Sequence, residues 1–298
     1  MRVTVVHNPT AGGAQAQTKT IAAALAAAGH EARWQSLKVD GWERVLDEPA
    51  DLVVVAGGDG SVRKVFLAIA GKPLPVTLLP IGSANNIARS LGVMGDEPER
   101  LIQGWDGHRL RSFDVGVLAG DRESPFVEAV GGGLFADVLA LAAQSAADPS
   151  GEEKVEHGLQ LLLDAVTAAE PSRWQLAVDG RALALELLAV EVTNVRETGP
   201  NVPLAPDADP GDGLLEAVLI RAEDRRGFLD YVQARLAGDD AVPPSFEAPR
   251  GARIELRPPA GVRLHVDDEL TATTPAVAVA AATARLQVWV PEDGNRDP

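Results

Sequence analysis

The first third of the chain alternates between two patterns of apolar and polar residues. Short apolar runs such as Leu52–Ala56 are typical of buried strands, whereas the alanine-rich Ala14–Ala28, which stops at Gly29, is typical of a helix. Strands that alternate with helices predict a parallel sheet with helices on its faces. Strands are expected over Val3–Val6, Glu31–Leu37, Leu52–Ala56 and Pro75–Pro80, and helices over Ala14–Ala28, Trp42–Leu46, Val62–Ala70 and Ala84–Leu91.

A different pattern begins near Phe113, where strand-like runs and hairpin signals become frequent. Trp174–Val178 and Ala182–Val192 are expected to be strands joined by a turn at Asp179-Gly180. Two helices and a long loop interrupt this pattern, over Glu152–Ala169, Arg226–Leu236 and Gly199–Gly213. We therefore expect an α/β domain over residues 1–114, with the last few residues of the chain as a candidate addition, and a mainly β domain over residues 115–290.

Composition and charge narrow the class of protein. With 298 residues, 46% of them hydrophobic and 23% charged, the chain has the length and balance of an ordinary two-domain globular protein. No apolar run approaches the roughly 18 residues that span a bilayer, and Met1–His7 lacks the pattern of a signal peptide, so we expect a cytoplasmic protein. The net charge of −16 disfavours a nucleic-acid partner and a polybasic membrane anchor.

Cysteine and histidine usage excludes several kinds of site. The chain has no cysteine, and its five histidines are far apart without metal-binding spacing. Disulfides, thiol chemistry and a histidine-bound metal are therefore not expected. An acidic protein can still bind an anionic substrate where backbone N–H groups and a metal ion supply local positive potential.

Three glycine-containing turns follow three expected strands of the first domain, at residues 8–13, 57–61 and 82–86. In an open parallel sheet the carboxyl ends of the strands lie at one edge, so three such turns can converge on one ligand. Glycines let backbone N–H groups approach phosphate oxygens, and each following helix directs its positive N-terminus toward them. The turns therefore predict a nucleotide-phosphate site, although their spacing matches neither the P-loop nor the full dinucleotide-binding fingerprint.

These turns resemble the diacylglycerol kinase catalytic family, which includes bacterial lipid kinases and sphingosine and ceramide kinases. Asn8-Pro9-x-x-Gly12, Gly57–Ser61 and Pro80–Leu91 are similar, in order and spacing, to its N-P-x-[ST]-G, G-G-D-G-T and P-x-G-T-x-N-D-x-A-R-x-L blocks. Further on, Asp212–Leu214 and Val266–Glu269 resemble its D-G-x-L and D-G-E segments. The similarity covers nearly the whole chain, and the G-G-D-G motif is shared with NAD kinases.

The resemblance implies a Rossmann-like α/β nucleotide-binding domain and a C-terminal β-sandwich-like domain, with the active site in the cleft between them. It implies Mg²⁺-dependent transfer of the γ-phosphoryl group of ATP to a lipid hydroxyl. Because the sequence shows no stable membrane anchor, we expect membrane contact to be peripheral and transient. Such a reaction needs positioning, a metal ion and a carboxylate that accepts the hydroxyl proton. The identity of the lipid and the formation of a homodimer are left open.

By this similarity, Asp267 and Glu269 are the carboxylates at the catalytic position, one of them acting as general base. Asp59 is expected to hold Mg²⁺ directly or through water. A second Mg²⁺ site is implied at Asp212 with the backbone carbonyls of Asp209 and Leu214. A plain Asp-Gly turn and a solvated acidic hairpin are the structural alternatives for these two acidic segments. The implied nucleotide-binding residues are Asn8, Pro9, Gly12, Ser36, Gly57, Gly58, Asp59, Gly60, Ser61, Gly82, Ser83, Asn85 and Asn86.

The chain also departs from the family pattern. Asn86 stands where aspartate is usual, Arg63 and Lys64 replace a polar and an acidic residue, and Asp268 replaces the glycine of D-G-E. A left-handed backbone at Asp268 would therefore be less favourable than at glycine. Two alternatives to an active lipid kinase stay open: a catalytically weak or inactive homologue that binds nucleotide or lipid, and an NAD kinase-like phosphotransferase that acts on a soluble substrate.

Overall fold

The computed structural model describes residues 1–9, 14–94, 97–119, 123–147, 149, 151–239, 241–271 and 277–292, with the backbone alone at 14–16 and 277–283. The chain divides into two compact units. The first unit consists of Met1–Val115 together with the end of the chain from Thr283. The second unit is Gly116–Ala282. Two strands, β5 (His108–Ala119) and β16 (Val277–Pro291), each extend from one unit into the other.

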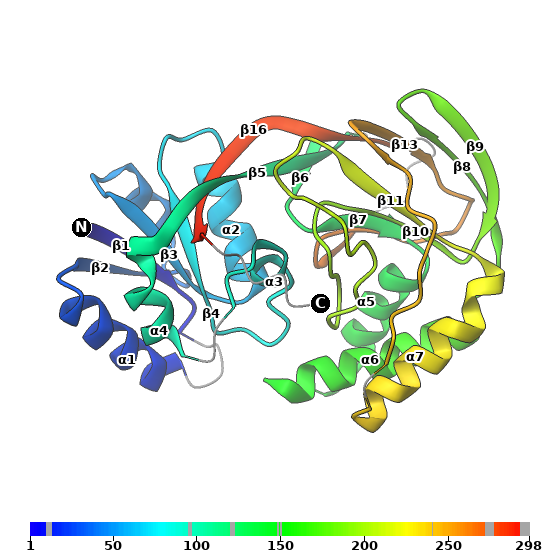
Figure 1. The fold of residues 1–298 in the computed structure, drawn as a ribbon. Coiled ribbons are helices and arrows are strands. Elements are labelled where there is room, and N and C mark those ends of the chain that lie inside the picture. The colour runs from blue at the N-terminus through cyan, green and yellow to red at the C-terminus, as the bar shows by residue number, and fades with distance from the viewer. Residues whose placement is uncertain are drawn as a thin grey trace. The chain divides into compact units, whose positions relative to one another are not determined.

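A parallel sheet forms the centre of the first unit (Figure 1). Its strands are β1 (Arg2–His7), β2 (Glu31–Ser36), β3 (Leu52–Gly57) and β4 (Val76–Pro80), in the order β2-β1-β3-β4. The three neighbouring pairs in this run are all parallel. β3 is buried along its whole length, as expected for a central strand covered on both faces. The end of β16 continues the sheet beside β4, where Val288 pairs with Val76.

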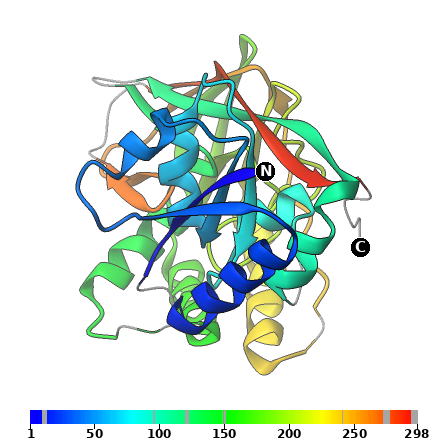
Figure 2. The same ribbon diagram turned by 90° about the vertical axis from the view of Figure 1, so that its left-hand side faces the viewer.

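Helices cover both faces of this sheet. Ile21 of α1 and Ile102 of α4 pack on the face that carries Val5 and Val54, whereas α2 packs against β3 from the other side (Figure 2). Alternate strand residues point to opposite faces, which is why Val54 contacts one set of helices and its neighbours contact the other. The helical elements are α1 (Ala14–Ala27), η1 (Trp42–Asp47), α2 (Asp59–Ile69), α3 (Asn86–Leu91), α4 (Pro98–Gln103) and η2 (Trp105–Gly107).

The returning end of the chain is fixed to the first unit by polar contacts. Arg285 Nε of β16 donates to the Asp114 carboxylate of β5 at 2.6 Å, and Asp114 is buried. Thr77 Oγ1 of β4 donates to the Trp289 carbonyl at 2.8 Å. A buried carboxylate needs a charged or hydrogen-bonded partner, so the Arg285 pair gives β16 a fixed place next to β5.

An antiparallel six-stranded sheet forms one layer of the second unit. Its order is β12-β11-β10-β7-β14-β15. The strands are β7 (Ala129–Gly132), β10 (Ala189–Thr193), β11 (Leu215–Ile220), β12 (Arg250–Gly251), β14 (Leu264–Val266) and β15 (Glu269–Thr271). Three helices pack with one face of this sheet around a shared apolar cluster (Figure 1): α5 (Leu134–Gln144), α6 (Glu152–Ala168) and α7 (Arg225–Ala237), the last preceded by η3 (Ala222–Asp224).

The other face of this sheet packs on a second sheet layer. Trp174 and Leu176 of β8 (Ser172–Val178) and Ile254 of β13 (Arg253–Arg257) share an apolar cluster with Val190 and Leu264 of the six-stranded sheet. The strand β9 (Arg181–Leu187) pairs with β8, β13 pairs with the start of β16, and β6 (Glu123–Phe126) pairs with β5. Two sheets that bury their facing side chains form a β-sandwich.

The α/β sheet followed by a β-sandwich-like part confirms the predicted fold class. Several details differ from the expectation. The helix α2 begins at Asp59 rather than Val62, so Asp59–Ser61 form its first turn. The expected strand Ala182–Val192 is two strands, because β9 pairs with β8 while β10 pairs with β7 and β11. The helix α5 was not expected, because its almost wholly apolar sequence lacks the polar face that marks a helical period.

Membrane-spanning helices are not found in the described part of the chain. The helix α6 has 17 residues and carries charged side chains in its first turn, and none of the described helices combines the length and the apolar character needed to cross a bilayer.

Replacing Phe66 of α2 by alanine is expected to destabilise the first unit by about 3 to 5 kcal/mol. The ring is fully buried and meets Phe113 edge to face with 5.0 Å between the ring centroids. Urea unfolding followed by tryptophan fluorescence measures the loss, because Trp34, Trp42, Trp105 and Trp289 all belong to the first unit. Phe66→Leu leaves a smaller cavity and should lose less than half as much; equal losses would contradict the packing argument.

Candidate functional site

The carboxyl ends of the four parallel strands bring the expected nucleotide-binding turns to one edge of the sheet. In the strand register, His7 at the end of β1 lies beside both Ser36 and Ala56, and Gly57 at the end of β3 lies beside Pro80. The next residue of the chain, Asn8, donates its N–H to the Ala56 carbonyl at 3.4 Å. The turns that start at Asn8, Gly57 and Gly82 are therefore neighbours; Gly12 lies outside the described residues, and Pro9 is exposed.

Two of these turns touch through glycines. The Cα atoms of Gly58 and Gly82 face each other, since a Cβ on Gly82 would lie 2.3 Å from Gly58 Cα and a Cβ on Gly58 would lie 3.0 Å from Gly82 Cα. Gly57 is also confined, because its Cβ would lie 2.5 Å from Ser61. The backbones of the two turns can approach this closely only because Gly58 and Gly82 lack side chains.

Asn85 fixes the shape of the turn after β4. Its Oδ1 accepts the Gly82 N–H at 3.1 Å and its Nδ2 donates to the Gly82 carbonyl at 2.8 Å. The backbone of Asn85 is left-handed, with φ 56°, a conformation that asparagine tolerates better than most residues. The expected amide side chain of the third turn thus holds Gly82 by both of its backbone polar groups.

Asp59 joins the second turn to the third. It lies in the first turn of α2, and its Oδ1 accepts the N–H of Ile87 at 3.0 Å at the start of α3. Burial raises the pKa of the Asp59 carboxyl above its usual value, while backbone N–H groups, that of Ile87 foremost, favour the charged form. A desolvated carboxylate of this kind is stabilised by a nearby cation.

The remaining expected residues of this edge are hydroxyl and amide side chains. Ser61 and Asn86 are buried, and Ser83 is half-buried. Ser36 accepts the N–H of Lys38 through Oγ at 3.1 Å. Gly60 is exposed in the first turn of α2, where the N–H groups of a helix have no acceptor within the helix. This edge of the sheet therefore offers a helix N-terminus and short polar side chains to an anionic ligand.

Asp267, in the second unit, is fixed by backbone N–H groups of one distant segment. Its Oδ1 accepts from Glu128 at 2.9 Å and from Ala129 at 3.1 Å, and Val127 donates to Oδ2 at 3.1 Å. Three donors hold the carboxylate as an acceptor, the role that an ionised carboxylate plays. The loop between β6 and β7 thus determines where Asp267 points.

The same loop is held from its other side by β10 and the residue after it. Asn194 donates its N–H to the Glu128 carbonyl at 2.9 Å, and Thr193 Oγ1 lies 3.3 Å from the same oxygen. Thr193 and Asn194 are both buried. The support of Asp267 therefore continues inward through Glu128 to the buried strand β10.

The hairpin that carries the acidic segment differs from the expectation at Asp268. Val266 pairs with Glu269, which leaves Asp267 and Asp268 as a two-residue loop between β14 and β15. The left-handed residue of this loop is Asp267, with φ 49°, and Asp268 has no positive φ. Aspartate at position 268, where the family usually has glycine, therefore causes no strain from a left-handed backbone. Asp267 is half-buried, whereas Asp268 and Glu269 are exposed.

The expected Mg²⁺ site near Asp212 stays a prediction. Asp212 Oδ1 accepts the Leu214 N–H at 2.9 Å and its Oδ2 is paired with Arg250, which also lies 3.5 Å from Glu216. The Asp209 carbonyl accepts the Asp212 N–H at 3.3 Å. In this arrangement the guanidinium supplies the positive charge, and a metal ion at Asp212 would have to displace it. No group of three or more acidic or histidine side chains in the described part of the chain is arranged for a metal.

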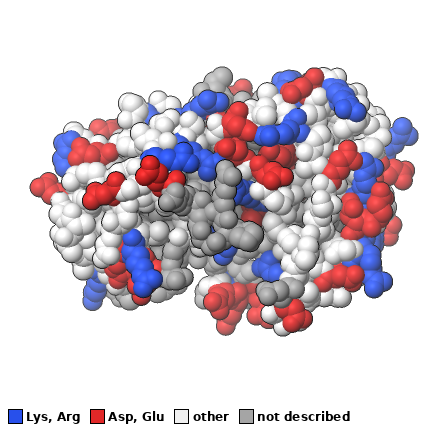
Figure 3. Space-filling view, viewed as in Figure 1, with Lys and Arg blue, Asp and Glu red and all other residues white. Residues whose placement is uncertain are grey.

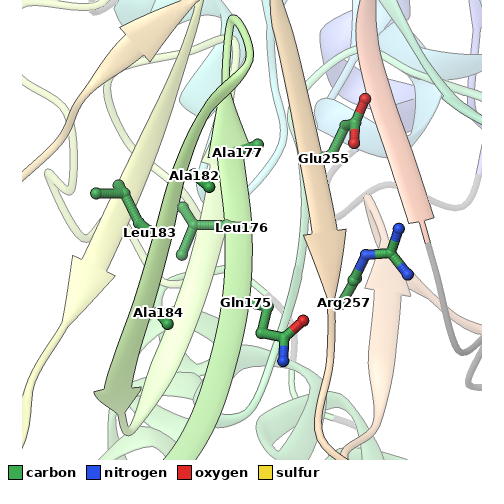
Figure 4. Close-up of a pocket in the computed structure, with 8 residues that line it drawn as sticks. All are labelled: Gln175, Leu176, Ala177, Ala182, Leu183, Ala184, Glu255 and Arg257. Atoms are coloured by element: carbon green, nitrogen blue, oxygen red, sulfur yellow. The ribbon is translucent and has the colours of Figure 1, made fainter.

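One hollow on the second unit is lined by residues other than those expected at the site. It has a volume of about 380 Å³ and lies on β8, β9 and β13, where small side chains such as Ala177 and Ala182 stand near Glu255 and Arg257 (Figure 4). On the coloured part of the face drawn in Figure 3, acidic and basic side chains are interspersed.

The sequence matches known families over both units. Residues 2–118 match the family described as the diacylglycerol kinase catalytic domain, and residues 130–290 match the YegS C-terminal NAD kinase beta sandwich-like domain. The chain belongs to the diacylglycerol kinase catalytic domain family, a family of ATP-dependent lipid kinases, and carries the YegS type of C-terminal domain. The resemblance stated from the sequence is thereby confirmed.

Relatives and solved structures agree with this family. The chain is 25% identical over 254 residues to a diacylglycerol kinase of Mycobacterium tuberculosis, covering 82% of this chain and 78% of the relative. It is 29% identical over 275 residues to a Pseudomonas aeruginosa protein named "Probable lipid kinase YegS-like", covering 86% and 85%. A diacylglycerol kinase crystal structure from Bacillus anthracis aligns with TM-score 0.69 at 19% identity, covering 97% and 96%. An NAD kinase from Archaeoglobus fulgidus in complex with ATP aligns with TM-score 0.51 at 13% identity, covering 99% and 96%. At these identities the structural likenesses establish the fold alone.

Sequence reasoning missed the residues that hold Asp267. The N–H groups of Val127–Ala129 cannot be recognised from side-chain chemistry, since any residue could supply them. His265 and Glu191 were not singled out as site residues, although His265 precedes Asp267 by two positions. Polar residues within otherwise apolar strands, such as Glu191 in Ala189–Thr193, were the available signal.

Gly82→Ala is expected to separate the two glycine turns and to weaken nucleotide binding by about tenfold or more, because its Cβ would overlap Gly58 Cα at 2.3 Å. Calorimetric titration with ATP measures the binding. The matched control is Gly107→Ala, whose Cβ meets no atom within 4 Å and whose φ is not positive. Unchanged ATP binding by a folded Gly82→Ala protein would show that the contact of the turns is not needed.

Glu216→Gln is expected to change how stability depends on pH. Burial raises the pKa of Glu216 to about 7, so between pH 4.5 and 7 the folded protein retains a proton that the unfolded chain has lost. Stability should therefore fall with rising pH in the wild type relative to the variant, by on the order of 1 kcal/mol. Urea unfolding at pH 5 to 8 measures the difference, with the exposed Glu186→Gln as control. Parallel pH profiles for wild type and Glu216→Gln would contradict the raised pKa.

Proposed function

We propose that this chain transfers the γ-phosphoryl group of ATP to the hydroxyl of a diacylglycerol-like lipid. The observation that carries the proposal is the contact of the Gly58 and Gly82 turns, which Asp59 joins to the start of α3. These turns lie at the carboxyl edge of a parallel sheet, where nucleotides bind in open α/β folds, and the N-terminus of α2 begins there. The family and the relatives named as diacylglycerol and lipid kinases support the lipid acceptor.

The first unit has the groups needed to hold the phosphates of ATP. The first-turn N–H groups of α2 and the hydroxyls of Ser61 and Ser83 would bind phosphate oxygens. Asp59 fits Mg²⁺ binding together with these phosphates, because it is a half-buried carboxylate and Mg²⁺ is usually held by one or two carboxylates plus substrate phosphate and water. When bound, the metal ion would neutralise charge on the phosphoryl group. Asn86 supplies an amide where the family usually has a second carboxylate, which leaves Asp59 as the anionic ligand of this turn.

The second unit has the carboxylate needed by the acceptor. Phosphoryl transfer passes through a loose transition state, so the acceptor hydroxyl needs orientation more than a strong base. Asp267 suits this role because three backbone N–H groups hold its carboxylate in one orientation. We assign Asp267 as the carboxylate that accepts the hydroxyl hydrogen, and Glu269, which is exposed on β15, as the second carboxylate near the acceptor. The acceptor would be taken from a membrane surface through peripheral, transient contact.

Asp267→Asn is expected to lower kcat by about 10²-fold or more, because an amide cannot accept the proton and its NH₂ group opposes the N–H donors. Asp59→Asn should instead raise the KM for Mg-ATP. Transfer from labelled ATP is measured with vesicles that contain diacylglycerol, monoacylglycerol, sphingosine or phosphatidylglycerol, and with NAD in solution. Transfer by Glu269→Gln measures the contribution of the second carboxylate separately from that of Asp267.

The matched control is Asp230→Asn, an exposed change on α7 that should leave transfer unaltered. If no acceptor is phosphorylated although ATP binds, the lipid kinase assignment fails and a nucleotide-binding role replaces it. Transfer to NAD alone would assign the chain to soluble-substrate kinases. Full activity of Asp267→Asn would remove Asp267 from the reaction.

A further inference from the structure

A row of three residues crosses the six-stranded sheet beside the Asp267 turn. His265 of β14 and Glu191 of β10 both pair with Gly131 of β7, the strand between them. A side chain on the middle strand would normally separate the side chains of its two neighbours. Gly131 has none, and a Cβ there would lie 2.4 Å from Glu191 Cδ. The Glu191 carboxylate therefore reaches over Gly131 to His265.

The imidazole of His265 connects this carboxylate to the Asp267 turn. Its Nε2 lies 3.1 and 3.0 Å from the two carboxylate oxygens of Glu191, and its Nδ1 lies 2.9 Å from the Asp267 carbonyl oxygen. A carbonyl oxygen only accepts hydrogen bonds, so Nδ1 carries a proton. Nε2 and Glu191 then share a second proton between them. His265 is 5% exposed and Glu191 is fully buried, so water does not substitute for either partner.

Asp267 needs support of this kind because its backbone is left-handed. A positive φ at the first position of a two-residue hairpin loop is usually supplied by glycine, and a residue with a side chain keeps it only when surrounding contacts hold it there. The Asp267 N–H donates to the Ala129 carbonyl at 2.7 Å, and the carboxylate accepts from Val127–Ala129. His265 holds the remaining backbone polar group of Asp267, its carbonyl.

We propose that His265 and Glu191 are positioning residues for Asp267: across Gly131 they hold its carbonyl, and with it the left-handed turn that aims its carboxylate. The role rests on the proposed function, in which Asp267 meets the acceptor hydroxyl. Neither residue contacts a reacting atom. They act through the backbone of the turn, from the face of the sheet that is covered by α5.

The charge of the pair gives the positioning a pH dependence. Burial disfavours the imidazolium, but the Glu191 carboxylate and the Asp267 carbonyl outweigh it, so the pKa of His265 lies above its usual value of 6.5. The stabilisation that the charged pair gives to the Asp267 turn is therefore complete below pH 6.5. It is lost as the pH rises through the raised pKa of His265. Elements packed against β14 also carry Glu123 on β6, Asp137 on α5 with its partner Arg263, and Asp268 and Glu269 at β15.

Glu191→Gln is the principal test, because glutamine keeps the shape of the side chain and removes its charge. Glu186→Gln, an exposed change on β9, is the matched control. If Glu191→Gln does not fold, His265→Gln is used for the amide-exchange and phosphoryl-transfer readouts. The first readout is ¹⁵N NMR of histidine-labelled protein across a pH series. We expect Nδ1 of His265 to be protonated in both proteins, and Nε2 to lose its proton at a lower pH in Glu191→Gln than in the wild type, because the Glu191 charge raises the pKa.

The second readout is hydrogen exchange of the Val127, Glu128 and Ala129 amides, which donate to the Asp267 carboxylate. Their exchange should be faster by about tenfold or more in Glu191→Gln and unchanged in Glu186→Gln. The third is phosphoryl transfer. In Glu191→Gln, kcat should fall by about tenfold while the KM for ATP stays constant, and the alkaline loss of wild-type kcat should disappear.

An unprotonated Nδ1 in the wild type, or amide exchange and kcat within about twofold of wild type in Glu191→Gln, would overturn the inference. A wild type that phosphorylates no acceptor but shows the expected NMR and exchange changes would defeat the proposed function and support the positioning of the turn. If the wild type is active but amide hydrogen exchange at Val127–Ala129 is the same in Glu191→Gln as in the wild type, the positioning role alone fails.

Discussion

The contact between the backbones of Gly58 and Gly82 is the constraint on which the first unit's polar edge depends. Turns after neighbouring strands are usually kept apart by side chains, and here the Cα atoms themselves face each other. The contact brings Asp59 within 3.0 Å of the Ile87 N–H and lets Asn85 hold both backbone polar groups of Gly82. Removing a side chain at two positions therefore organises hydrogen bonds at several others.

Both units hold a carboxylate in the same way, by backbone N–H groups of a segment that is distant in sequence. Asp59 accepts from the start of α3, and Asp267 accepts from the loop before β7. Backbone donors cannot change rotamer, so a carboxylate held by them keeps one orientation more strictly than one held by flexible side chains. This is the property that a phosphoryl-transfer site needs, because its catalysis depends on positioning.

Two buried glutamates of the second unit lie beside basic side chains. Glu191 meets His265, and Glu216 lies 3.5 Å from Arg250. Glu216 is only partly compensated, which leaves its pKa near 7, whereas the Glu191 pair also bonds to the Asp267 turn. Pairs of this kind are weak contributors to stability but strongly penalise any arrangement that separates the partners. Such pairs therefore contribute more to a specific geometry than to the stability of the fold.

The sequence determined the fold class, the family and the glycine turns, because these depend on local hydrophobic period and on short motifs whose residue types have few substitutes. It predicted Asp59, Asn85 and Asp267 as site residues but not what holds them. Only the tertiary structure revealed that Asp267 rather than Asp268 is left-handed, that Arg250 balances Asp212, and that His265 reaches Glu191 across Gly131. These features are made by strands whose pairing and register join distant segments, and a single chain's local pattern does not encode which residue will lie opposite which.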